Sequence, residues 1–91
     1  MGHVRVTAAT LTEGRIDKLG VELLGLGART IDRDTTVSWM KDGHSFIPVV
    51  DGKEAPALQL VSIEEGDEVT FAVRDDHEQT PTDKLPNLPK A

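Results

Sequence analysis

The dipeptide Asp42-Gly43 is the feature of this sequence that most narrows the choice of fold. Asp-Gly favours the positive φ angles that a two-residue type I′ β-hairpin loop requires. Such a loop sets the strand register, and here it would place Trp39 opposite Phe46 on one apolar face. The pattern therefore predicts strands over Thr35–Lys41 and His44–Val50, with the two aromatic rings on the same side of the sheet.

A second hairpin is predicted further along the chain. Residues Glu64–Asp67 contain a glycine and three acids, which is typical of a tight turn. The turn joins Ala57–Ile63 to Glu68–Arg74, and in the second of these segments apolar and polar residues alternate with a period of two. This alternation indicates a strand with one buried face.

The N-terminal third gives conflicting signals. Val4–Ala8 alternates and predicts a first strand. Over residues 10–27, a capping-box pattern and apolar residues at helical spacing favour a helix, whereas three interior glycines oppose it. A strand at Val21–Leu26 is the alternative. The predicted fold class is accordingly α+β, with a small antiparallel sheet of two hairpins plus a first strand and one helix, and an all-β small barrel is the alternative.

The chain length and the distribution of apolar residues predict one domain. Ninety-one residues leave room for a single core, and with few aromatic residues that core must be aliphatic. We expect residues 1–74 to form the compact domain. Residues 75–91 are acidic, contain three prolines and show no periodicity, so we expect a flexible tail.

Charge and cysteine content restrict the compartment and the partners. The chain has no cysteine and a net charge of −6, and the excess of acids lies in its second half. A reducing cytoplasm is the expected location. No window approaches the roughly 18 apolar residues that a membrane span needs, so membrane insertion is not expected. The negative charge disfavours a phosphate backbone, which makes a protein partner or a homodimer through an exposed strand edge a better expectation than nucleic acid.

No motif with chemical spacing is present, so we predict no catalytic residue, no cofactor and no metal site. The three histidines, His3, His44 and His77, are too widely spaced in sequence to suggest a triad or a zinc site. The carboxylates are expected in turns and on solvent-facing positions. Trp39 and Phe46 would form either a stacking surface or, more commonly for such a pair, part of the core.

Several segments together resemble a TrkA-C domain, the C-terminal regulatory domain of potassium-transport regulators. The resemblance covers residues 4–74 and is carried by the strand Val4–Ala8, by Lys41 with Asp42-Gly43, by Pro48, and by Gly66-Asp67-Glu68-Val69. It implies a regulatory, ligand-sensing module.

The sequence is also similar to the AbrB/MazE family. Trp39, Ile47-Pro48 and the Gly66–Val69 segment match the order of residues in that family. This second resemblance implies a DNA-binding antitoxin whose acidic tail, here residues 75–91, binds a toxin. The expected function is therefore a non-catalytic small regulatory or interaction module, with the antitoxin as the alternative and a small-molecule ligand also allowed.

Overall fold

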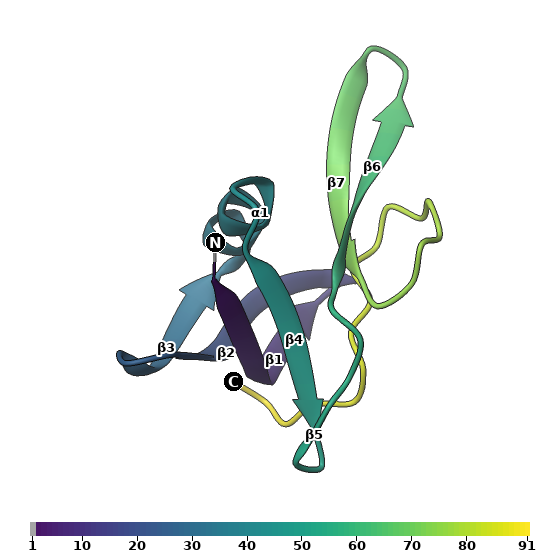
Figure 1. The fold of residues 1–91 in the computed structure, drawn as a ribbon. Coiled ribbons are helices and arrows are strands. Elements are labelled where there is room, and N and C mark those ends of the chain that lie inside the picture. The colour runs from purple at the N-terminus through teal and green to yellow at the C-terminus, as the bar shows by residue number, and fades with distance from the viewer. Residues whose placement is uncertain (1) are drawn as a thin grey trace.

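A mixed sheet of five strands and a separate two-stranded hairpin make up the β-structure of the computed structural model, which describes residues 2–91 (Figure 1). The five-stranded sheet has the order β3-β2-β1-β4-β5, and β6 pairs with β7. Among the strand pairs within residues 2–91, only β1 and β4 run parallel. The elements are β1 (His3–Thr12), β2 (Arg15–Leu23), β3 (Gly27–Asp32), α1 (Arg33–Lys41), β4 (Ser45–Val50), β5 (Lys53–Glu54), β6 (Gln59–Glu65) and β7 (Glu68–Arg74).

The predicted fold class is confirmed at the level of α+β with a small sheet and one helix. Within residues 2–91 the strands do not close into the alternative barrel. The first strand is longer than expected and lies at the centre of the five-stranded sheet. The hairpin predicted around Gly66 is also confirmed, because β6 and β7 pair from Gln59 opposite Arg74 to Glu65 opposite Glu68.

The hairpin predicted at Asp42-Gly43 is wrong, because Thr35–Lys41 lies in helix α1 instead of a strand. Asp32 caps the helix N-terminus by accepting a hydrogen bond from the Thr35 amide at 2.8 Å. Gly43 follows the C-terminal cap with a φ of 95°. A glycine at positive φ suits the end of a helix as well as it suits a hairpin loop, so the dipeptide alone does not separate the two structures. Trp39 and Phe46 are neighbours nevertheless, with ring centroids 6.3 Å apart.

The helix favoured over residues 10–27 is also wrong, because this region forms the end of β1, the turn into β2, β2 itself and the loop that leads to β3. Glu13 and Gly14 both have positive φ, 52° and 76°, as in a type I′ loop between β1 and β2. Gly20 lies opposite Ala8, where a Cβ on residue 20 would come within 3.1 Å of the Ala8 side chain. The glycines that oppose a helix here are therefore used for a turn and for a close strand contact.

We expect Glu13→Asn to stabilise the protein. Glutamate is an unfavourable residue at positive φ, and asparagine tolerates this conformation better. The free energy of unfolding should rise by about 0.5–1 kcal/mol, measured by urea denaturation. Asp51→Asn is the matched control, because Asp51 has the same φ of 52° in the β4–β5 loop and is already tolerant of it. A Glu13→Asn variant no more stable than the wild type would show that this loop carries no strain.

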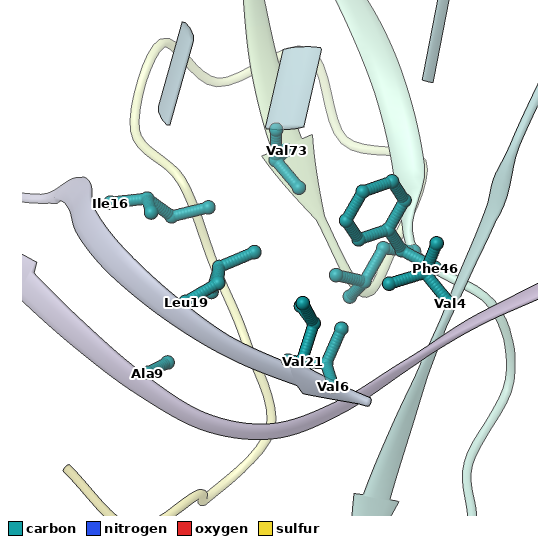
Figure 2. Close-up of a cluster of buried hydrophobic side chains, with 9 residues drawn as sticks. Val4, Val6, Ala9, Ile16, Leu19, Val21, Phe46 and Val73 are labelled. Atoms are coloured by element: carbon teal, nitrogen blue, oxygen red, sulfur yellow. The ribbon is translucent and has the colours of Figure 1, made fainter. Parts of the chain in front are cut away.

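The hydrophobic core lies where the five-stranded sheet meets α1 and the base of the β6–β7 hairpin. Figure 2 shows side chains of β1 and β2 directed toward Phe46 and Val73. The far end of the hairpin projects away from the sheet (Figure 1), and Val69 near its tip is 57% exposed. The buried cluster is Val4, Val6, Ala9, Ile16, Leu19, Val21, Phe46, Leu58 and Val73.

Residues 75–91 were expected to extend from the domain, but in the structure they run back across it (Figure 1). The Pro89 carbonyl accepts a hydrogen bond from the Ala9 amide at 2.8 Å, beyond the part of β1 that pairs with β4. Leu85 and Leu88 pack against the core. Asp83 is buried, with 5% of its surface exposed. Residues 75–91 are therefore held against the domain by polar contacts and two leucines, which their composition does not indicate.

Candidate binding groove

The loop between β2 and β3 presents two leucines to solvent. Leu23 pairs with Gly27, so the loop consists of Leu24, Gly25 and Leu26. Gly25 and Gly27 have φ angles of 81° and 79°, which permit the tight reversal. Leu24 is fully exposed, with a relative exposure of 101%, and Leu26 is 62% exposed. We call residues 24–26 the leucine loop.

Beside the leucine loop lies an open groove with a volume of about 1120 Å³. Four parts of the chain line it: the loop with the adjoining ends of β2 and β3, the start of β1, the region where α1 leads into β4, and Glu54 of β5. Apolar surface predominates in the lining, to which Val4, Leu23, Trp39 and Ile47 contribute. The groove is therefore built by the β2–β3 loop and by the α1–β4 connection, both of which differ from the sequence-based prediction.

Polar contacts hold the N-terminal side of the groove. His44 Nδ1 accepts a hydrogen bond from the Gly2 amide at 3.1 Å, and the His44 ring lies 6.1 Å from that of Trp39. The Gly2 carbonyl in turn accepts from the Ser45 amide at 3.0 Å. These contacts tie the start of the chain to the α1–β4 connection and keep Trp39 at the wall of the groove.

Charges of both signs surround the apolar lining. Arg5 on β1 lies opposite Glu22 on β2 and opposite Ile47 on β4. Glu54 of β5 also lines the groove. Because successive residues of a strand face opposite sides of the sheet, Arg5 lies on the face away from the buried Val4 and Val6. The lining of the groove thus includes residues from both faces of the sheet, with Arg5, Glu22 and Glu54 on the outer face and Val4 on the core face.

A second polar cluster joins residues 75–91 to the rest of the domain. Arg33 Nε donates to Asp83 Oδ2 at 2.8 Å, and Arg33 Nη2 donates to Asp83 Oδ1 at 3.2 Å. The same carboxylate accepts the Ile16 amide at 2.8 Å and the Val73 amide at 2.9 Å. Asp83 thus connects α1, β2 and β7 through four hydrogen bonds from three residues, which marks a structural role.

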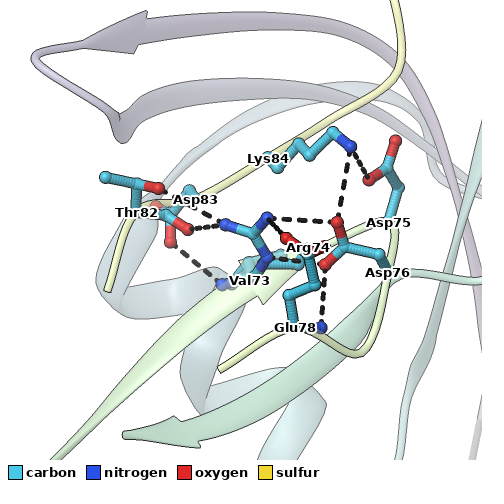
Figure 3. Close-up of polar contacts among 8 residues, drawn as sticks. All are labelled: Val73, Arg74, Asp75, Asp76, Glu78, Thr82, Asp83 and Lys84. Atoms are coloured by element: carbon cyan, nitrogen blue, oxygen red, sulfur yellow. Dashed lines mark hydrogen bonds and ion pairs between the residues drawn. The ribbon is translucent and has the colours of Figure 1, made fainter. Parts of the chain in front are cut away.

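The ionisation of this cluster follows from those contacts. Burial raises the pKa of Asp83, but the hydrogen bonds from Arg33, Val73 and Ile16 outweigh it and hold the pKa below its ordinary value. Nearby, Arg74 donates to Asp76 at 2.6 Å and to the Thr82 carbonyl at 2.7 Å (Figure 3). The hydrogen bond from Arg74 lowers the pKa of Asp76. Both carboxylates are therefore charged at neutral pH.

The structure distributes the residues considered in the sequence analysis over different sites. His3 and His44 both line the groove, whereas His77 lies in the exposed part of residues 75–91. Phe46 is fully buried, so it belongs to the core, and Trp39 contributes to the core edge and the groove wall together. Among residues 2–91 no group of three His, Asp or Glu side chains is placed to hold a metal ion.

Sequence reasoning missed the leucine loop. Both the helix predicted over residues 10–27 and the alternative strand at Val21–Leu26 include this loop within a regular element. The available signal was the alternation of leucine with Gly25 and Gly27, because closely spaced glycines favour a turn and a turn exposes its side chains.

No family model, curated protein or solved structure matches the chain. In the part of the chain that the structure describes, no helix is long and apolar enough to cross a membrane.

Proposed function

We propose that this protein is a non-catalytic interaction module that binds an apolar segment of a protein partner at the groove and the leucine loop. The observation that carries the proposal is the exposure of Leu24 and Leu26 beside an apolar groove. Exposed apolar surface costs about 25 cal/mol per Å² relative to burial, and contiguous patches of it usually mark interaction sites. The groove offers an aromatic wall, Trp39, of the kind that often contributes most to binding.

A protein partner fits the electrostatics better than nucleic acid. The net charge of −6 repels a phosphate backbone. The groove itself carries Glu22 and Glu54 against the single Arg5. An apolar lining with a few charged groups at its margin is the usual composition of a protein interface.

The proposal can be tested with a peptide library displayed on phage. Peptides selected on the wild-type protein should contain apolar anchors, and their binding should change the fluorescence of Trp39, which is the only tryptophan in the chain. Leu24→Ser with Leu26→Ser should weaken the selected peptides at least tenfold, because burial of one leucine contributes about 1.5–3 kcal/mol.

Val69→Ser is the matched control, because Val69 is 57% exposed on the distant β6–β7 hairpin. This variant should bind the peptides as the wild type does. Peptides that bind both variants equally, with no change in Trp39 emission, would place the interaction elsewhere and contradict the proposal.

A small-molecule ligand, as in the regulatory role that the TrkA-C resemblance implies, is the second candidate function. The largely apolar lining favours it, although the volume of about 1120 Å³ lies just above the usual range of about 300–1000 Å³ for small-ligand pockets. A thermal-shift screen with nucleotides, cyclic dinucleotides and salts tests this candidate, since a ligand that binds only the folded state raises Tm. A flat response would leave the protein partner as the function. The antitoxin alternative requires residues 75–91 to bind a toxin. We do not favour it, because these residues contact their own domain instead.

A further inference from the structure

We infer that the occupant of the groove is the leucine loop of a second copy of this chain, so that the protein forms a two-fold symmetric dimer. This inference rests on the proposed function and names its partner. In a two-fold dimer the same surface faces itself, so that surface must contain both a projecting part and a part that receives it. Leu24 projects, with full exposure, at the margin of the groove that would receive its counterpart.

Two of the three charged groups in the groove lining are self-complementary, whereas the third, Glu22, lies opposite Arg5 within the same chain. Arg5 supplies the positive charge, and Glu54, which lies on the other side of β4 in the sheet order, supplies a negative one. A two-fold axis through the groove would bring each Arg5 toward the Glu54 of the partner copy and would form this contact twice. Opposite charges at the margin of an interface fix its register and favour encounter.

The exposed edge of β3 is a less suitable dimer contact. Its outer side is unpaired within residues 2–91, and nearly all its residues are exposed. Antiparallel pairing of β3 with its own copy about a two-fold axis at Thr30 would place the two Arg29 side chains on the same face as diagonal neighbours. If the two-fold axis lay at residue 29 instead, the two Arg29 side chains would lie directly opposite each other. The groove can bring each Arg5 to a carboxylate of the other copy, whereas the edge brings the two Arg29 side chains together.

The experiment is sedimentation velocity over a concentration series up to 1 mM, on the wild type and on three variants. The wild type should form a dimer, and dilution should shift the emission of Trp39 as the groove opens. Leu24→Asp should weaken the dimer at least tenfold. Its fold should be intact, because the side chain is fully exposed. Val69→Asp, at the hairpin tip, and Thr30→Glu, on the β3 edge, should dimerise as the wild type does.

A charge exchange provides a second, independent measurement. Arg5→Glu and Glu54→Arg should each weaken the dimer, and the double variant should restore it. A wild type that stays monomeric at 1 mM would overturn the inference, and so would a dimer sensitive to Thr30→Glu and insensitive to Leu24→Asp. If a monomeric wild type still binds selected peptides at the leucine loop, the proposed function stands and only the second copy is excluded. If the peptides fail as well, both proposals fail.

Discussion

Replacing Asp83 by asparagine is expected to lower the free energy of unfolding by about 3 kcal/mol, the lower end of the range for breaking a buried ion pair. The Asp83 side chain is fully buried, whereas Arg33 keeps 24% of its side chain exposed and can be partly solvated when its partner is lost. The amides of Ile16 and Val73 also lose a charged acceptor. In a domain of this size the loss corresponds to a fall in Tm of roughly 12–24 °C, measured by calorimetry.

Asp67→Asn is the control, because Asp67 lies in the exposed β6–β7 turn and its substitution should change stability by less than about 0.5 kcal/mol. The pH dependence supplies a further check. The folded-state pKa of Asp83 lies below the ordinary value of 3.8, so its contribution is complete above that value and is lost as the pH falls through the lower folded pKa. The difference in Tm between the wild type and Asp83→Asn should therefore narrow below about pH 4. Equal melting of the two asparagine variants at pH 7 would contradict the structural role of Asp83.

Removing residues 75–91 should have a larger effect than the Asp83 substitution and should leave little cooperative folding. The truncation deletes the Asp83 carboxylate together with Leu85 and Leu88, which pack against the core. Single domains have only about 5–15 kcal/mol of stability in total. Loss of the buried ion pair and of the two packed leucines would remove most of this stability. We expect the truncated chain to lack a sharp thermal transition and sharp amide signals in NMR spectra.

A shorter truncation serves as the comparison. Removal of residues 89–91 deletes the Pro89 carbonyl that accepts from Ala9 and leaves Asp83 and the two leucines in place. It also removes the exposed contact of Ala91 with the Thr10 hydroxyl, so the free energy of unfolding should fall by about 1–2 kcal/mol. If the chain that ends at residue 74 melts like the full protein, residues 75–91 are a dispensable tail, as their composition indicates.

The sequence was most informative where one signal had a single structural meaning. The Glu64–Asp67 turn with alternating residues after it could only be a hairpin, and β6–β7 has that form. Val4–Ala8 alternates in the same way and lies in β1. Asp42-Gly43 had two meanings, because a glycine at positive φ ends a helix as readily as it turns a hairpin. The N-cap at Asp32 shows that the helix is the structure formed. This cap can be recognised only when the position of the Asp32 side chain is known.

The candidate groove was not predictable from the sequence. It depends on the loop from Leu23 to Gly27 being a turn, and on Trp39 reaching the same place from α1. The apolar run gave no indication of which leucines are buried, since leucine spacing of this kind fits a helix, a strand or an exposed loop.

By itself, the amino-acid sequence determined the first strand and the second hairpin, because local alternation and turn residues act over a few neighbouring positions. The α+β class was predicted correctly, but its helix lies at Arg33–Lys41 and not within residues 10–27. Only the tertiary structure showed where residues 75–91 lie and that Arg33 pairs with Asp83. The Arg33–Asp83 contact joins residues 50 positions apart, and the amides that complete it come from two different strands. Such a contact leaves no periodic trace in the sequence, because its stability arises from burial and charge pairing in space rather than from any local backbone preference.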